Sequence, residues 1–76
     1  MEFKYIIKIP DTCGGLPVFK DTRIPIYIIL DFLSTGETVE SILENYPQLT
    51  SGHIYEAIRF ASELSKYNEE LIEISG

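Results

Sequence analysis

The sequence predicts a small, mostly α domain: a three-helix core of helix-turn-helix type, preceded by a short N-terminal β-hairpin or β-arm. The chain has 76 residues, of which 45% are apolar, so it is expected to form a single domain over residues 1–76. Three stretches after residue 23 carry apolar side chains at helical spacing, while two short β-leaning runs precede them. The arm is therefore placed in residues 1–22, and the helical core and tail in residues 23–76.

The arm is predicted from alternation on either side of a glycine turn. In residues 3–9, Phe3, Tyr5 and Ile7 alternate with Lys4, Ile6 and Lys8. Gly14 and Gly15 separate this run from a second one over residues 17–20. Because an isolated two-stranded hairpin is only marginally stable in water, we expect it to lie on the helices or on another chain.

The first helix is predicted from Pro25 to about Thr35, because proline suits a first helical turn and Gly36 suits the position after the last one. Its apolar residues fall on nearly every side: Ile26, Tyr27, Ile28, Ile29, Leu30, Phe32 and Leu33. A helix with this pattern is expected to be buried all round. The arm or a second copy of the chain would then cover its second face.

A shorter and a longer helix follow, each with its own start signal. Thr38 and Thr50 are good N-caps for the two helices, and Pro47 ends the shorter one. The side chains expected to point inward are Val39, Ile42, Leu43 and Tyr46 in the shorter helix, and Ile54, Ala57, Ile58, Ala61 and Leu64 in the longer. For residues 68–76 we expect a continued helix, with a strand as the alternative. Two capped helices joined by a short turn indicate a helix-turn-helix-like unit.

Charge and residue content exclude several classes of function. Six Lys and Arg stand against twelve Asp and Glu, giving a net charge of −6, so a broad nucleic-acid surface is not expected. Cys13 is the only cysteine and His53 the only histidine, which leaves no disulfide, no two-histidine metal site and no nucleophile–base pair. We expect no enzymatic activity, cofactor, metal or small-molecule substrate. With no signal peptide or membrane span in the sequence, we expect a cytoplasmic protein.

Two groups of residues are candidates for binding. On the outward side of the longer helix, the candidate DNA-binding residues are Ser51, His53, Tyr55, Arg59 and Lys66. In the arm and the first helix, the candidate partner or dimer interface comprises Phe3, Tyr5, Ile7, Arg23, Tyr27, Ile28 and Phe32. Two acids of the longer helix, Glu56 and Glu63, would face phosphates unfavourably. Arg23 has a structural alternative, because a guanidinium can tie the arm to carbonyls or a carboxylate of the helical body.

The segment from Gly15 to Ile26, Gly-Leu-Pro-Val-Phe-Lys-Asp-Thr-Arg-Ile-Pro-Ile, and the later Tyr46-Pro47-Gln48-Leu49-Thr50 resemble motifs of the domain-of-unknown-function 433 family. The resemblance spans roughly residues 14–72. At two places the chain departs from the family pattern: Asp21 stands where glycine is usual, and Ser51-Gly52-His53 replaces Pro-Glu-Asp. If the turn at residue 21 needs a positive φ, aspartate tolerates it better than most residues.

The resemblance implies a homeodomain-like or winged-helix-like three-helix core. For many members it also implies the role of a VapB-like antitoxin in a type II toxin–antitoxin system. The expected partner is a PIN-like, Mg-dependent ribonuclease toxin encoded alongside, bound by a homodimer that also binds its own operator DNA. Two alternatives stay open. One is a stand-alone helix-turn-helix transcription regulator, and the other is a structural dimeric interaction module.

Overall fold

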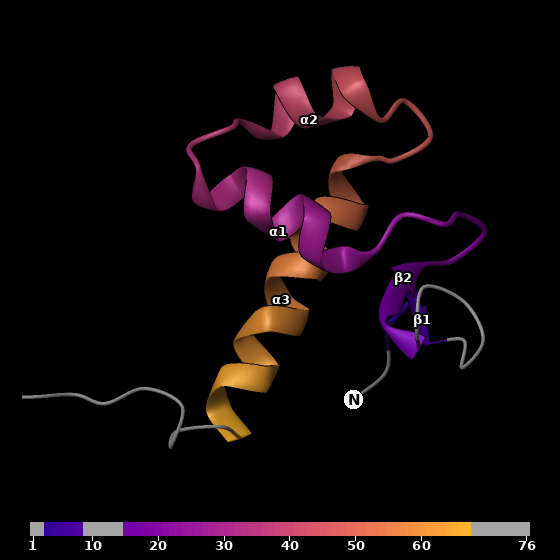
Figure 1. The fold of residues 1–76 in the computed structure, drawn as a ribbon, viewed down its shortest axis with the longest axis vertical. Coiled ribbons are helices and arrows are strands. Elements are labelled where there is room, and N and C mark those ends of the chain that lie inside the picture. The colour runs from indigo at the N-terminus through magenta and orange to yellow at the C-terminus, as the bar shows by residue number, and fades with distance from the viewer. Residues whose placement is uncertain (1–2, 9–14, 68–76) are drawn as a thin grey trace, which may run out of the picture.

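A computed structural model of the chain describes residues 3–8 and 15–67, and it shows a hairpin followed by three helices (Figure 1). The elements are β1 (Ile6–Lys8), β2 (Pro17–Phe19), α1 (Ile26–Ser34), α2 (Val39–Asn45) and α3 (Ser51–Tyr67). The predicted class, a mostly α domain with three helices and an N-terminal hairpin, is confirmed. The prediction for residues 68–76 lies outside the described residues.

The hairpin is antiparallel, and β2 is its inner strand. Its residue pairs are Ile6 with Phe19, Ile7 with Val18, and Lys8 with Pro17. On the other side of β2, Val18 forms a bridge with Pro25, and the Phe19 N–H donates to the Ile24 carbonyl at 3.0 Å. The start of α1 is thereby tied to the sheet, and β1 is the outer strand.

The turn between β2 and α1 depends on two polar residues. Asp21 has a φ of 64°, in the left-handed region that glycine adopts most easily. Thr22 stabilises the turn, since its hydroxyl donates to the Phe19 carbonyl at 2.7 Å and accepts the Ile24 N–H at 3.1 Å. Asp21 therefore occupies the conformation that the glycine of the family pattern suggested.

The helices begin and end close to the predicted residues. Pro25 is the N-cap of α1, and Gly36, with a φ of 94°, follows its end. Thr38 caps α2, because its side chain accepts the Ser41 N–H at 3.1 Å. The turn to α3 covers residues 46–50. Pro25 and Thr38 thus begin helices, and Gly36 follows the end of one, as the sequence predicted.

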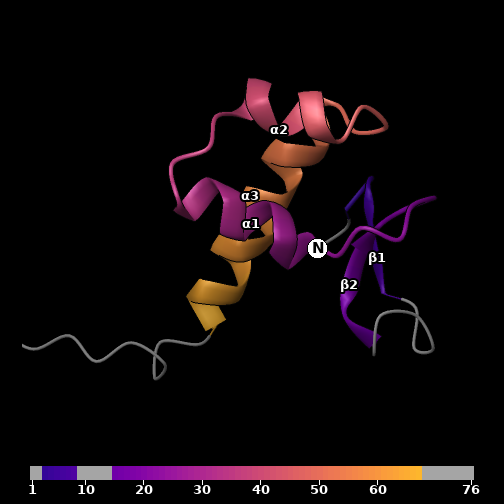
Figure 2. The same cartoon turned by 45° about the horizontal axis from the view of Figure 1, so that its top comes forward.

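The core lies where α1, α2, α3 and the hairpin meet. In Figure 2, α1 crosses α3, α2 lies near the start of α3, and the hairpin stands beyond the start of α1. The most deeply buried side chains are Val18 and Phe19 of β2, Ile26 and Ile29 of α1, Ile42 of α2, and Ile54 and Ala57 of α3. None of the helices in the described ranges is long and apolar enough to cross a bilayer.

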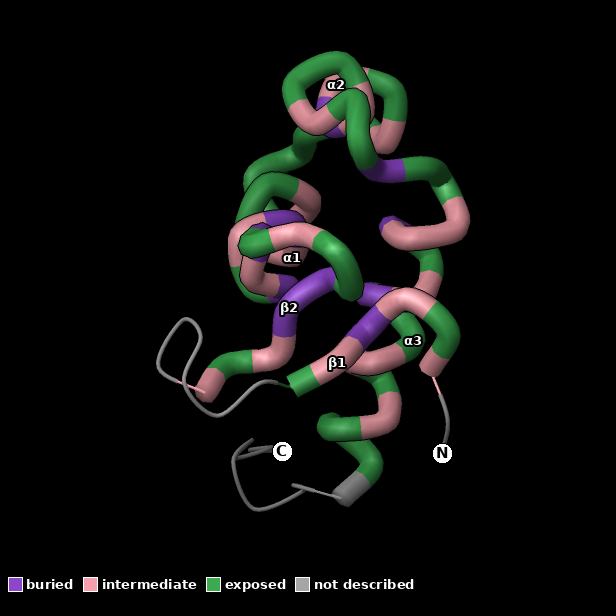
Figure 3. Tube along the Cα trace, turned by 90° about the vertical axis from the view of Figure 1, so that its right-hand side faces the viewer, coloured by how far each residue is buried: buried purple, intermediate pink, exposed green. Residues whose placement is uncertain are grey.

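Two expectations about burial were wrong. Ile58 and Leu64 were expected to point inward, yet they are 44% and 50% exposed. α3 is longer than the helices that it crosses, so its last turns, which include Leu64, extend past the core, as the green and pink segments in Figure 3 show. Ile58 is exposed in the middle of the helix, next to the buried Ala57. The first helix is not buried all round either, because Tyr27 and Phe32 are 52% and 37% exposed. The arm packs on α3 and does not cover these two side chains of α1.

Candidate partner-binding surface

Residues 3–5, directly before β1, lie along α3 and are held there by the ring of Phe3 and the backbone of Tyr5. The ring of Phe3 packs edge-on against Phe60, with centroids 5.4 Å apart. The Tyr5 N–H donates to Oε1 of Glu56 at 2.6 Å. The arm was expected to lie on the helices or on another chain, and in the structure it lies on α3.

His53 joins this arm to the start of α3. Its ring stacks on Tyr5 with a centroid distance of 4.0 Å, and it meets Phe19 edge-on at 5.5 Å. Its Nδ1 accepts the Thr50 N–H at 3.0 Å. Because a backbone N–H can only donate, Nδ1 carries no proton, and the neutral ring holds its proton on Nε2. Burial lowers the pKa of His53 below its ordinary 6.5, and the Glu56 carboxylate partly offsets this.

Four of the five candidate DNA-binding residues are exposed on α3: Ser51, Tyr55, Arg59 and Lys66. Ser51 is exposed at its first turn, and Tyr55 is 61% exposed one turn later. His53 is instead half-buried beneath the arm. The arm therefore covers one side of the face that was predicted to meet DNA, and it leaves the side with Ser51 and Tyr55 open.

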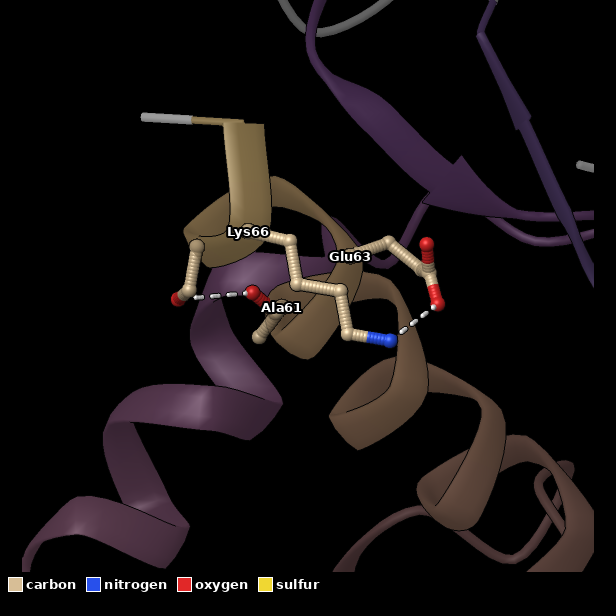
Figure 4. Close-up of polar contacts among 4 residues, drawn as sticks. Ala61, Glu63 and Lys66 are labelled. Atoms are coloured by element: carbon tan, nitrogen blue, oxygen red, sulfur yellow. Dashed lines mark hydrogen bonds and ion pairs between the residues drawn. The ribbon is translucent and has the colours of Figure 1, made fainter. Parts of the chain in front are cut away.

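The two candidate cations of α3 both have neighbours within the chain. The Arg59 guanidinium lies 4.9 Å from the centre of the Phe3 ring, a cation–π distance. Nζ of Lys66 lies 3.3 Å from Oε1 of Glu63, one turn earlier (Figure 4). Because the Lys66 side chain is 64% exposed, this pair contributes little to stability.

The predicted interface residues fall into separate groups. Phe3 and Tyr5 are half-buried on α3, and Arg23 is exposed at the junction with α1. The Phe32 ring lies 6.1 Å from that of Tyr46, on the α2 side of α1. The others are Ile7 and Ile28, which are half-buried, and Tyr27, which is exposed. The structure thus brings together only part of this set.

An apolar hollow of about 350 Å³ lies between the hairpin and the second half of α3. It is lined by Phe3, Ile6, Ile7, Lys8, Pro17, Phe60 and Leu64. A second hollow of about 210 Å³ continues toward α1 and is lined by Leu16, Pro17, Ile26, Tyr27, Leu30, Phe60 and Leu64. Because the two share Pro17, Phe60 and Leu64, they form one surface, here called the apolar groove. Lys8 is its only charged lining residue.

Sequence reasoning found part of this groove and missed the rest. Phe3, Ile7 and Tyr27 of the groove were predicted interface residues, whereas Leu64 was assigned to the core. Leu16, Pro17 and Phe60 were not singled out. Phe60 carried a usable signal, because it is a large apolar residue outside the inward stripe of its helix. Its partner across the groove could not be found, since the contact joins α3 to the hairpin.

Charge is separated along the described chain. Residues 3–8 and 15–25 contain four cations and one acid, a net charge of +3. Residues 26–50 contain four acids and no cation, and α3 contains two of each. The hairpin end of the molecule is therefore basic, and the end with α2 is acidic. Within the described ranges, no three His, Cys, Asp or Glu side chains are grouped to hold a metal ion.

A hairpin tied to the start of α1 and a three-helix core define the class as a small, mostly α hairpin–helix domain. A family model described as "Protein of unknown function (DUF433)" matches residues 6–61, which is most of the chain. The chain belongs to the DUF433 family, as its sequence motifs indicated.

Two proteins illustrate the similarity. The crystal structure of a DUF433 member protein from Anabaena variabilis ATCC 29413 has a TM-score of 0.71 and 29% sequence identity, covering 87% of this chain and 61% of that chain. The uncharacterized protein y4eO of Sinorhizobium fredii (strain NBRC 101917 / NGR234) is 39% identical over 59 residues. That match covers 78% of this chain and 25% of y4eO, so the chain spans about a quarter of the length of this relative.

Proposed function

We propose that this domain is the antitoxin of a type II toxin–antitoxin system, which binds and neutralises a PIN-like ribonuclease in the cytoplasm and has no catalytic role of its own. The observation that supports binding of a protein is the apolar groove. Leu16, Tyr27 and Leu64, which line it, are each about half exposed. Clustered apolar surface of this kind marks a protein–protein contact more often than a free surface.

The identity of the partner rests on the family resemblance. Members with the Thr-Arg-Ile-Pro motif, here Thr22 to Pro25, are expected beside a toxin gene. The charge distribution supports a protein partner over a broad nucleic-acid surface, since the basic end carries a net charge of only +3. We propose that the antitoxin acts as a homodimer and represses its own operator.

Co-expression with the protein encoded beside it tests the proposal. The wild-type chain is expected to co-purify with that protein and to relieve the growth arrest that the protein causes. Tyr27→Ser, within the groove, is expected to weaken both effects. Phe32→Ser is the matched control, because Phe32 is also an exposed aromatic residue of α1 but lies outside the groove. Failure of the wild type to co-purify and to protect would reject the antitoxin function.

A stand-alone transcription regulator is the second candidate, and the open strip of α3 at Ser51 and Tyr55 favours it. In a helix-turn-helix unit, the second helix reads the major groove of DNA. A gel-shift titration with the DNA upstream of the gene tests this: Tyr55→Ala is expected to weaken a shift and Tyr27→Ala to leave it unchanged. No shift with the wild type would reject a regulator. A dimer that binds neither DNA nor a toxin would indicate the structural interaction module.

A further inference from the structure

We infer that the apolar groove binds an acidic amphipathic segment of a partner protein. The segment would place its apolar side chains between the hairpin and α3, and its carboxylates beside Lys8 and the neighbouring cations. The inference rests on the proposed function for the identity of the protein that carries the segment. The chemistry of the segment follows from the groove and from the charges around it.

The groove suits a row of apolar side chains. Its two parts, about 350 and 210 Å³, run from the hairpin across Leu64 to Tyr27 on α1. A segment lying along it meets aliphatic and aromatic walls over its whole length. Burial of such surfaces is the main source of affinity in protein recognition, so the side of the segment that faces the groove must be apolar.

The rim of the groove is basic at the hairpin. Lys8 is exposed at the end of β1 and lines the groove directly. Beyond Phe3, a neighbouring hollow is lined by Lys4, Glu56 and Arg59. The acid among these already accepts the Tyr5 N–H. Carboxylates on the polar side of a bound segment therefore meet cations on this rim.

The charges on the rest of the described surface favour an acidic segment over a basic one. Residues 26–50 carry only acids, and the whole chain has a net charge of −6. A basic segment would be attracted to the acidic end, away from the groove. An acidic segment is repelled there and attracted only at the hairpin end. Charge complementarity of this kind selects partners and orients their encounter.

Two synthetic helical peptides test the inference without a toxin. They share one apolar pattern, and their polar positions hold glutamate in one and lysine in the other. Titrated into isotope-labelled protein at low salt, the glutamate peptide is expected to bind about tenfold more tightly and to shift the amide resonances of Leu16, Tyr27 and Leu64. The net charge of −6 by itself predicts the opposite order. Tighter binding of the lysine peptide, or binding of neither, would overturn the inference.

Two charge-reversal variants test whether the peptide binds in the apolar groove. Lys8→Glu is expected to weaken binding of the glutamate peptide about tenfold, because it reverses the charge on the rim. Lys20→Glu is the matched control: it changes the net charge equally at an exposed lysine of the hairpin region, but Lys20 lines a different hollow. At about 0.15 M salt, where the Debye length is only about 8 Å, we expect the affinity of this variant to stay within about twofold of the wild type. Equal losses for the two variants would contradict a contact in the groove.

The outcomes separate this inference from the antitoxin function. Preference for the glutamate peptide without co-purification of a toxin would keep the groove assignment and reject the antitoxin. Co-purification that Lys8→Glu leaves unchanged, without a peptide preference, would keep the antitoxin and reject the groove assignment. Concentration-dependent self-association that Leu64→Ser abolishes, again without a peptide preference, would assign the groove to a second copy of the chain and overturn the inference.

Discussion

His53 is the third residue of α3, and its side chain occupies the place that glutamate or glutamine takes in a capping box. Nδ1 accepts the N–H of Thr50, the residue before the helix. The same ring stacks on Tyr5 of the arm. One side chain thus caps a helix and holds the arm, and it does both as a neutral imidazole.

The stability of the domain should depend on pH through this residue. The folded state favours neutral His53 and lowers its pKa, so protons bind preferentially to the unfolded chain. Stability is then full above pH 6.5, the ordinary pKa of histidine, and falls as the pH drops through the lowered pKa of the folded state. Urea titrations at a series of pH values, with an NMR titration of the ring, measure both quantities. A folded-state pKa above 6.5 would contradict this account.

His53→Gln supplies the control for this prediction. Glutamine can accept the Thr50 N–H at the same helix position but does not titrate. We expect the variant to lose the change in stability between about pH 7 and pH 5.5, because His53 is the only histidine of the chain. An unchanged pH profile would show that another group is responsible.

Asp21 provides a second test at a single residue, because its φ of 64° is unfavourable for a residue with a β-carbon. Asp21→Ala is expected to be less stable than Asp21→Gly by about 1 kcal/mol, since alanine has no polar group to bond locally in this conformation and glycine has no β-carbon. Denaturant titrations of the two variants measure the difference. Equal stabilities would mean that the turn relaxes to a negative φ.

At the scale of elements, the sequence specifies helices better than it specifies how far each is covered. The bounds of α1, α2 and α3 follow from Pro25, Thr38 and Thr50, because caps and breakers act locally. Ile58 shows the limit of this reasoning. It continues the inward stripe of α3, but whether a stripe is covered depends on the length and crossing of neighbouring helices, which periodicity does not contain.

Two isoleucines of α3 test this difference in burial. Ile54 is fully buried, and Ile54→Ala is expected to cost about 2 to 5 kcal/mol of unfolding free energy. Ile58 is 44% exposed, and Ile58→Ala should cost less than about 1 kcal/mol. Because a small domain has a stability of only about 5 kcal/mol or slightly more, the first variant is expected to be partly unfolded at room temperature. Similar losses in denaturant titrations of the two variants would contradict the observed register of α3.

The candidate site was harder to predict than the helices, for a physical reason. Each wall of the apolar groove comes from a different part of the chain: Leu16 precedes β2, Tyr27 lies on α1, and Leu64 lies on α3. Exposed Tyr27 could be suspected from an excess of apolar residues on its helix. That Leu16 and Leu64 lie beside it depends on how the hairpin docks, and docking is set by long-range contacts.

At the scale of the whole molecule, the contact between Tyr5 and Glu56 joins residues 51 positions apart. Glu56→Ala removes the acceptor of the Tyr5 N–H and is expected to cost about 1 to 2 kcal/mol, because this is a hydrogen bond to a charged group that is only half-buried. Amide hydrogen exchange should speed up in the hairpin more than in α1. The effect reports how strongly the arm is held by the helical core.

Glu44→Ala is the matched control for this experiment. Glu44 is an exposed glutamate on α2, so its replacement changes the net charge equally and leaves the arm in place. We expect a change within about 0.5 kcal/mol, as for most surface substitutions. If the two variants were equally stable, the bond between Tyr5 and Glu56 would contribute nothing in solution.

The same contact sets an order of events during synthesis. Translation delivers the arm before its docking site on α3. Tyr5 of the nascent chain therefore has no Glu56 until 51 further residues are added, and Phe3 waits longer still for Phe60. In a ribosome-bound chain halted before residue 56, the arm lacks its docking site on α3 and the hairpin is supported only at the start of α1. Docking of residues 3–5 therefore waits for α3, and the arm acquires its native contacts only after that helix emerges.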